Sequence, residues 1–287
     1  KFRKERSLQK TLERKEYIDQ NGYWDNKREV FSRNLEGLWK ERGSNNLAGR
    51  VHTVDIDFNN NLIYLASSGG NIWKGTLDGD SWESLNDYMQ INDIKLVRLI
   101  ETNDMRRLLI GSADGVFYTD DEGVIINQSE GLDSPLDWGE FYRFIVKETS
   151  NQIVIYALAK EWDDDIWSSA VSIYRSDDLG VSFNKIYSEQ LQSEGSYDIW
   201  TYRYSNQDIF FLKKGELYSI SDDNQLSFIS QISTSGEGEN LLTGGIDGSL
   251  FLYAKIDDEL YYSNSNFGNW DNLGTLPSYT FFRNSFK

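Results

Sequence analysis

The feature that most restricts the fold of this chain is a short turn motif that recurs five times. The clearest copy, SDDLGVSF at residues 176–183, fits the pattern S-x-D-x-G-x-S/T-W/F at every fixed position. More degenerate copies begin at residues 76, 119, 221 and 263, so successive starts are 43, 57, 45 and 42 residues apart. A period of about 40–50 residues is typical of β-propeller blades, each built from four strands.

Short apolar and aromatic runs lie between the copies and end at clusters of Gly, Asn and Asp, as strands do. Each unit opens with one such run, and a sixth opening run follows the last copy; the six runs are 51–58, 96–101, 142–147, 199–204, 240–243 and 279–282. The sequence therefore predicts an all-β fold. We expect residues 39–287 to form a β-propeller of four-stranded blades, with five full blades and the start of a sixth.

The repeated turn has a structural explanation. Its Asp can accept hydrogen bonds from backbone N–H groups of the same turn, its Gly tolerates a positive φ, and its closing aromatic side chain can be buried between strands. We therefore expect a structural role, not a catalytic one, for Asp78, Asp121, Asp178, Asp223, Trp82, Phe183, Phe228 and Trp270.

Residues 1–38 differ from the rest of the chain in charge. Residues 1–40 hold eleven Lys and Arg against seven Asp and Glu, whereas the whole chain has a net charge of −17. The spacing of Leu8 and Leu12 predicts a mainly helical, charged segment over 1–38. The acidic remainder repels phosphate backbones, so nucleic acid is not an expected partner.

Two further absences in the sequence limit the possibilities. No run of about 18 apolar residues occurs, so no membrane-spanning helix is expected. The chain has no Cys, so packing and strand pairing must hold the fold without disulfides.

The repeats resemble the Asp-box (BNR-type) propellers, a group that includes sialidases, xyloglucanase-type glycosidases and sortilin-like receptor domains. The first repeat resembles more specifically the large secreted Bacteroidetes surface proteins, on Trp39, GRV at 49–51, LIYLASSGGNIWK at 62–74 and WESL at 82–85. That resemblance implies a secreted or cell-surface, non-catalytic binding or adhesion protein. It also implies type IX secretion, contact with the outer-membrane secretion machinery during export, and a front part of a longer protein that carries a sorting domain.

Enzyme functions find little support in the residues. The Arg-Ile-Pro motif of sialidases is absent. The xyloglucanase-type family keeps an Asp just before Gly-Gly in its first blade, whereas this chain reads ASSGG at 66–70, with a serine in place of the carboxylate. Arg50 and Arg98 lie on opening strands, where inward-facing arginines are conceivable, but ordinary strand residues are the favoured interpretation. Only one His, His52, is present, so a nucleophile–base pair or a zinc site is not expected. No catalytic residue is predicted; the alternative is a glycoside hydrolase, sialidase- or xyloglucanase-like, whose two carboxylates have no assigned position.

No cofactor or metal site is predicted. Residues 55–61, DIDFNNN, space oxygen atoms like the start of an EF-hand loop, but the sixth position has no Gly and the twelfth is Ala66. A strand that runs into a polar turn explains this segment better, and calcium stays possible without a full motif.

The interval of 57 residues suggests where a ligand binds. Its surplus falls at 127–140 and 160–170, which we expect to be long loops, and functional residues gather on such loops. Exposed Trp beside Asp is a common arrangement for stacking on sugars. The alternative is that these Trp pack over the adjoining blade. The predicted ligand is a polysaccharide or a surface protein, and the candidate binding residues are Trp138, Trp162, Asp164 and Trp167.

Overall fold

The computed structural model describes residues 50–102, 105–132, 140–149, 152–163, 167–192, 196–202, 209–247, 249–264 and 266–276, together with four residues near the N-terminus. Those four, Glu13, Lys15, Glu16 and Gln20, have helical backbone. The rest of the predicted helical segment 1–38, and the predicted sixth opening strand at 279–282, lie outside the described residues. No described helix is long and apolar enough to cross a membrane.

Twenty strands form five antiparallel sheets of four, which confirms the prediction of four-stranded blades within the described part of the chain. Blade 1 consists of β1 (Val51–Asp57), β2 (Leu62–Ser67), β3 (Ile72–Thr76) and β4 (Trp82–Ser84). Blade 2 consists of β5 (Ile94–Glu101), β6 (Arg106–Ser112), β7 (Gly115–Thr119) and β8 (Asn127–Gln128). Blade 3 consists of β9 (Glu140–Glu148), β10 (Ile153–Asp163), β11 (Ser168–Ser176) and β12 (Asn184–Gln190).

The last two blades have the same strand order. Blade 4 consists of β13 (Tyr197–Trp200), β14 (Ile209–Lys213), β15 (Glu216–Ile220) and β16 (Leu226–Gln231). Blade 5 consists of β17 (Asn240–Asp247), β18 (Ser249–Ile256), β19 (Glu259–Asn264) and β20 (Asp271–Thr275). In every blade the strands pair in chain order, so the first strand is at one edge of the sheet and the fourth at the other.

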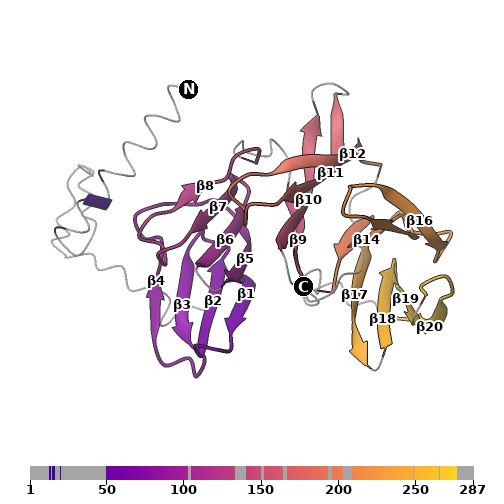
Figure 1. Cartoon of the computed structure of the whole chain (residues 1–287), viewed down its shortest axis with the longest axis horizontal. Coiled ribbons are helices and arrows are strands. Elements are labelled where there is room, and N and C mark those ends of the chain that lie inside the picture. Colours follow the sequence, from indigo (N-terminus) through magenta and orange to yellow (C-terminus); the bar gives the residue numbers. More distant parts are fainter. Residues whose placement is uncertain are drawn as a thin grey trace, which may run out of the picture.

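The five blades follow one another along an arc that is open between β1 and β17 (Figure 1). The first strands of successive blades contact each other, from β1 through β5, β9 and β13 to β17, and no comparable contact joins β1 to β17 in the described residues. Four apolar clusters fill the spaces between neighbouring blades, for example Tyr64, Ile72 and Ile110 between blades 1 and 2. The core therefore consists of inter-blade layers, because each sheet has an apolar face for each neighbour.

The repeated turns join the third strand of each blade to the fourth. In blade 3, Asp178 accepts hydrogen bonds from the backbone N–H of Ser182 at 2.9 Å and from the hydroxyls of Ser176 and Ser182 at 2.8 and 2.6 Å. In blade 2, Asp121 accepts from the backbone N–H of Ile125 at 2.8 Å. The side chain of the Asp thus fixes its own turn, because it satisfies donors that the hairpin leaves unpaired.

Each turn after the first also packs on the preceding blade. A Cβ added to Gly123 in the blade 2 turn would lie 2.1 Å from the carbonyl oxygen of Leu85 in blade 1. Phe183 in the blade 3 turn donates its N–H to Glu130 of blade 2 at 2.9 Å, and Arg175 of blade 3 donates to Asn224 in the blade 4 turn at 2.9 Å. The repeated turn is therefore an inter-blade connector as well as a hairpin turn.

The expectation that every closing aromatic is buried is wrong for two blades. Phe183 is buried, but Trp82 and Phe228 are 37% and 58% exposed. Trp82 follows the first turn, which has no preceding blade among the described residues, and its ring lies over Gly75 of its own sheet. Phe228 follows the turn that lacks Gly, and its ring packs on Tyr218 of its own blade, 5.6 Å between centroids. Trp270 is partly buried and donates to Ser230 of blade 4 at 3.1 Å.

We expect Asp178→Asn to destabilise the protein at neutral pH and to have a progressively smaller effect in acid. Burial opposes ionisation of Asp178, but the hydrogen bonds from Ser182 and Ser176 outweigh it and hold the pKa of this carboxyl below its ordinary value of 3.8. Its stabilising contribution is therefore complete above about pH 5 and is lost as the pH falls through the folded-state pKa. Urea unfolding of both proteins between pH 7 and pH 3 measures the difference; a difference that grows in acid would contradict this sign.

Candidate binding site

The first strands of blades 1, 2 and 3 surround a pocket on the inside of the arc. The pocket has a volume of about 480 Å³ and is lined by residues of β1, β5 and β9. A second space of about 150 Å³, lined by residues of β5, β9, β13 and Thr201, shares Arg98, Arg143 and Phe144 with the first. We call the two together the axial pocket. Most of the lining of the larger space belongs to the beginnings of β1, β5 and β9, so the pocket opens toward the side where the inner strands start.

Two arginines in the axial pocket are each held by a carboxylate of a neighbouring blade. Arg98 on β5 donates to Asp55 on β1 at 3.3 Å, and Asp55 also accepts the backbone N–H of Leu99 at 2.6 Å. Arg143 on β9 donates to Asp198 on β13 and to the carbonyl oxygen of Leu242 on β17, the latter at 2.7 Å. These contacts hold and orient the guanidinium groups at the blade interfaces, because the carboxylates that they pair with are largely buried and fixed within the fold.

Asp198 is the most deeply buried carboxylate of this site. Besides Arg143, it accepts the backbone N–H groups of Leu242 and Ile199 at 2.7 and 3.0 Å. Burial raises the pKa of the Asp198 carboxyl, while Arg143 and the two N–H groups act in the opposite direction by stabilising its charged form. These contacts are all with donors of blades 3, 4 and 5, so the carboxylate joins these three blades.

His52 lies at the wall of the axial pocket. Its side chain is only 8% exposed, and its Nδ1 lies 3.7 Å from the carboxylate of Asp93, which also pairs with Lys95 at 2.9 Å. Burial, followed by the charges of Lys95 and Arg50, lowers the pKa of His52, so the ring is neutral at pH 7. The buried Nε2 has no hydrogen-bond partner in the described structure. The sequence suggested only a strand residue here; the structure places an unused ring nitrogen beside a pocket.

The candidate residues Trp162 and Trp167 lie on the β10–β11 hairpin. We expected a loop over 160–170, but this is wrong: β10 continues to Asp163 and β11 begins at Ser168. The backbone pairs stay in register to the end, so the hairpin prolongs the sheet rather than interrupting it. Trp162 is 40% exposed and Trp167 is 81% exposed. The predicted loop over 127–140 begins with strand β8, and most of its remainder lies outside the described residues, as do Trp138 and Asp164.

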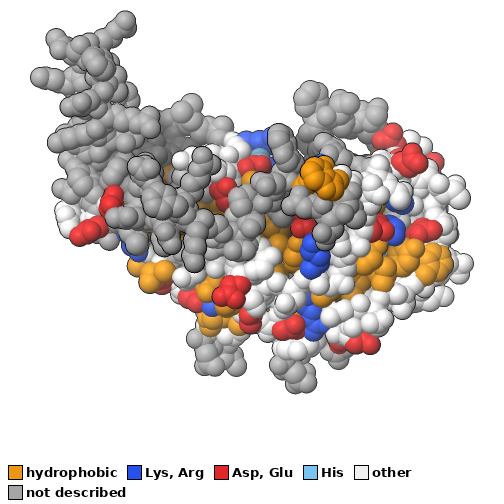
Figure 2. Space-filling model, turned by 90° about the horizontal axis from the view of Figure 1, so that it is seen from above, with side chains coloured by type: hydrophobic (Ala, Val, Ile, Leu, Met, Phe, Trp, Pro, Cys, Tyr) orange, Lys and Arg blue, Asp and Glu red, His pale blue; other side chains and the backbone are white. Residues whose placement is uncertain are grey.

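The register of blade 3 puts this hairpin on the same side as the pocket opening. Ala159 on β10 pairs with Phe141, which lines the pocket at the start of β9. Trp162 is three residues farther along β10, about 10 Å beyond that pair. Figure 1 shows the end of β10 and the beginning of β11 at the top of the molecule. Figure 2 looks onto that side, where hydrophobic, basic and acidic side chains are exposed close together. We call this side the pocket face.

Glu161 braces the base of the hairpin. Its carboxylate accepts a hydrogen bond from Tyr174 at 2.6 Å and pairs with Lys185 at 2.6 Å. Successive side chains of a strand point to opposite faces, so Trp162 projects from the other side of the sheet, the side that faces blade 4. The bracing holds the exposed Trp on a rigid strand, which lowers the entropy lost when a ligand binds.

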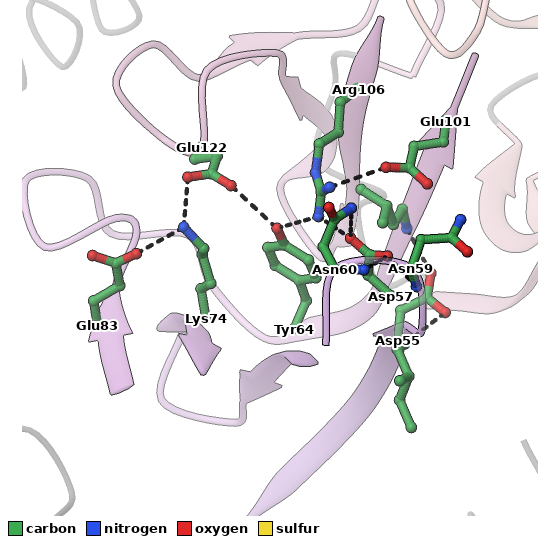
Figure 3. Close-up of polar contacts among 12 residues, drawn as sticks. Asp55, Asp57, Asn59, Asn60, Tyr64, Lys74, Glu83, Glu101, Arg106 and Glu122 are labelled. Atoms are coloured by element: carbon green, nitrogen blue, oxygen red, sulfur yellow. Dashed lines mark hydrogen bonds and ion pairs between the residues drawn. The ribbon is translucent and has the colours of Figure 1, made fainter. Parts of the chain in front are cut away.

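A second polar cluster joins blades 1 and 2 (Figure 3). Arg106 donates to Tyr64 at 2.8 Å, to Glu101 at 3.0 Å and to Asp57, and Tyr64 in turn donates to Glu122 at 3.3 Å. Burial raises the pKa of Tyr64, so its phenol stays protonated and is not a nucleophile at neutral pH. The donors and acceptors of this cluster come from both blades and pair with one another, so we interpret the cluster as an inter-blade contact.

The segment with calcium-like spacing belongs to the same cluster. Asp57 accepts the backbone N–H groups of Asn59 and Asn60 at 3.0 Å each and the side-chain amide of Asn60 at 2.8 Å. Its oxygens therefore close a polar turn after β1. In the described residues no group of three or more His, Cys, Asp or Glu is placed to hold a metal ion.

Sequence reasoning came near one residue of the axial pocket. It considered an inward-facing Arg98 but favoured an ordinary strand residue, and Arg98 lines the pocket. Trp162 and Trp167 stay predicted binding residues. Sequence reasoning missed Arg143, His52 and Thr201. The available signal was that Arg98 and Arg143 both lie within the opening strands of their units, at positions that point toward the propeller axis.

No protein-family model matches the sequence, and no curated protein matches it either. Solved structures share its fold at low sequence identity. An ancestral GH74 enzyme has a TM-score of 0.58 at 16% identity over 78% of this chain, which spans only 31% of the enzyme chain. A chain of a nidogen/laminin complex has a TM-score of 0.52 at 9% identity, over 80% of this chain and 81% of that one. An oligogalacturonate lyase in complex with manganese has a TM-score of 0.50 at 12% identity, over 80% and 67%. At such identities the likeness shows the propeller fold alone.

Proposed function

We propose that this protein is a non-catalytic binding propeller that recognises a polysaccharide through its pocket face. The observation that carries the proposal is the meeting of two features there: a pocket lined by Lys95, Arg98 and Arg143, and a braced hairpin with two exposed tryptophans. Large exposed aromatic side chains next to a concave polar site are typical of ligand-binding surfaces. A surface protein is the other ligand class, and it is an outcome of the binding test.

The cellular setting is part of the same proposal. The first repeat resembles secreted Bacteroidetes surface propellers, so we propose a secreted or cell-surface location, export by the type IX system and transient contact with its outer-membrane machinery. The total number of blades is also part of this proposal: five described sheets in an open arc leave room for the sixth unit that the sequence suggests. Detection of the protein on intact cells, before and after loss of the secretion system, tests the setting.

Trp167 supports a binding role more directly than any other residue. It is 81% exposed and has a φ of 49°, a left-handed conformation that costs an L residue about 1–2 kcal/mol. Asn or Gly would fit such a turn position better and would expose less apolar surface. A bulky aromatic at a strained and exposed position gives the folded state no evident stability, which favours a contact with something outside the chain.

We therefore expect Trp167→Asn to leave the free energy of unfolding unchanged or slightly raised while polysaccharide binding weakens by a factor of about 30. That factor corresponds to about 2 kcal/mol, the usual loss for a central aromatic contact. Trp162→Ala should weaken binding similarly. Isothermal titration calorimetry against a panel of soluble polysaccharides, with thermal unfolding in parallel, measures both quantities.

Phe58→Asn is the matched control, because Phe58 is 74% exposed but follows the end of β1, on the side opposite the pocket face. It should bind like the unmodified protein. Loss of binding in Phe58→Asn, or unchanged binding in both Trp variants, would contradict the assignment of the pocket face.

The alternative function is a glycoside hydrolase, which we retain because the fold resembles that of a GH74 enzyme chain. Hydrolysis ordinarily requires two positioned carboxylates, yet no Asp or Glu lines the axial pocket among the described residues. Ser67, near the place of the family Asp, is bonded to Asn71 within its own turn. An assay on fluorogenic glycosides separates the two functions: turnover that a single carboxylate substitution abolishes would establish the enzyme.

A further inference from the structure

The axial pocket has a basic lining in an acidic protein. Lys95, Arg98 and Arg143 line it, and no Asp or Glu does so among the described residues, although the chain has a net charge of −17. The carboxylates that pair with the two arginines lie deeper in the fold: the side chains of Asp55 and Asp198 are 13% and 5% exposed, against 34% for Arg98. A ligand therefore meets the two arginines before their carboxylates, whereas Lys95 keeps the half-exposed Asp93 beside it.

The guanidinium groups retain unused donors. Arg98 makes one hydrogen bond, at 3.3 Å, and Arg143 uses only Nη1, in contacts with other described residues. An arginine has five N–H donors in a planar fork that matches a carboxylate in a bidentate manner. The existing contacts with Asp55 and Asp198 hold each fork in place, which reduces the entropy that a new hydrogen bond would otherwise lose.

Two buried polar atoms of the same pocket have no partner in the described structure. These are Nε2 of His52 and Oγ1 of Thr201. The carboxylate of Asp93 beside Nδ1 of His52 favours the ring proton on that nitrogen, so Nε2 can accept a hydrogen bond. Buried polar atoms without partners cost about 1–3 kcal/mol each. Both atoms are covered in this structure, so they mark polar groups in the pocket wall and not surfaces that a ligand meets directly.

We propose that the axial pocket binds a carboxylate-bearing sugar, a hexuronic acid residue of an acidic polysaccharide. Its carboxylate would lie against Arg98, Arg143 and Lys95, which line the two spaces. Tyr142 and Trp200, which also line the pocket, offer ring surfaces for the faces of the sugar. This inference rests on the proposed binding function and specifies its ligand class.

The size and charge of the protein restrict how such a polymer binds. A pocket of about 480 Å³ is within the usual range for small ligands, about 300–1,000 Å³, and fits a short oligosaccharide. The acidic body repels a long polyanion that lies across its surface. The expected ligand is therefore a chain end or a short oligomer, not an extended polymer.

The test compares an alginate oligosaccharide with its carboxyl-reduced counterpart, which keeps the backbone and loses the charge. Titration calorimetry should show at least tenfold tighter binding of the acidic form. Lys95→Gln and Arg98→Gln should each reduce that preference at least fivefold. Lys95 has only the half-exposed Asp93 as a paired carboxylate, so Lys95→Gln keeps the test valid should Arg98→Gln fail to fold.

Lys255→Gln is the matched control. Lys255 pairs with Glu239 at 2.7 Å and is 22% exposed, close to Lys95 with its pair at 2.9 Å and 29% exposure, but it lies on β18, away from the pocket lining. Its variant should keep the full preference for the acidic oligosaccharide.

Three outcomes would overturn the inference. Equal binding of the two oligosaccharides, still lost in Trp167→Asn, would leave the binding function standing and remove the acidic ligand class. Equal affinity for a sulfated dextran oligosaccharide would show a general anion site instead of a carboxylate site. Absence of binding to every acidic and neutral polysaccharide in the panel would overturn the inference and the proposed function together.

Discussion

Replacing Gly123 by alanine should destabilise the protein by about 3 kcal/mol or more. Gly123 has a φ of 88°, and its added Cβ would lie 2.1 Å from the carbonyl oxygen and 2.9 Å from the Cβ of Leu85 in the preceding blade. The left-handed conformation costs about 1–2 kcal/mol, and forcing extra volume into a packed interface adds about 1–3 kcal/mol. The backbone of Leu85 belongs to a neighbouring blade, so relief requires separating the two blades.

Gly79 offers a matched control for that change. It lies in the first repeated turn with a φ of 81°, and no atom lies within 4 Å of an added Cβ. Gly79→Ala should therefore carry only the conformational cost, about 1–2 kcal/mol. Urea unfolding of both variants measures the difference. Equal losses would show that the blade 2 turn does not pack on blade 1 as an inter-blade connector.

Replacing Arg143 by methionine should cost about 3–5 kcal/mol, the usual penalty for leaving a buried charge without its partner. Asp198 would keep its hydrogen bonds from Leu242 and Ile199 but would lose the cation that compensates its charge. Arg143 also donates to the carbonyl oxygen of Leu242, so blades 3, 4 and 5 all lose a contact. Thermal and urea unfolding of the variant measure the loss.

Lys74→Met is the control for the arginine variant. Lys74 pairs with Glu83 and Glu122, whose side chains are 62% and 45% exposed. Lys74 itself is 18% exposed, but the carboxylates that the variant leaves behind stay solvated. Ion pairs with exposed partners contribute about 0–1 kcal/mol, so this variant should lose little stability. The double variant Arg143→Met, Asp198→Leu should recover most of the loss, because it removes the unpaired charge. A stable Arg143→Met protein would contradict the inter-blade role of this pair.

The sequence predicted the blade architecture because its repeated unit is local. The turn at 176–183 fixes its own hairpin through Asp178 and Gly180, so the spacing of five such turns reveals five strand pairs without any knowledge of tertiary contacts. The same locality explains the errors. Whether Trp82 or Phe228 is buried depends on the neighbouring blade, and the turn itself carries no information on that neighbour.

The binding site was less accessible to sequence reasoning, for the same physical reason. Trp162 and Trp167 attracted notice through a local surplus of residues, although β10 extends to Asp163 and β11 begins at Ser168. Arg143 meets Asp198, 55 residues later in the chain, only after the inner strands of two blades have aligned. Whether Nε2 of His52 has a hydrogen-bond partner depends on the side chains packed around it, and the spacing of residues in the sequence does not reveal that packing.

The most direct test of the account is to locate a bound polysaccharide by hydroxyl-radical footprinting, which reports the accessibility of individual side chains. With the tightest ligand of the panel, oxidation of Trp162 and Trp167 should fall, while oxidation of the exposed Phe58, Trp82 and Phe228 should stay unchanged. Protection of Phe58, Trp82 or Phe228, with Trp162 and Trp167 still fully oxidised, would place the ligand elsewhere and contradict the assignment of the pocket face.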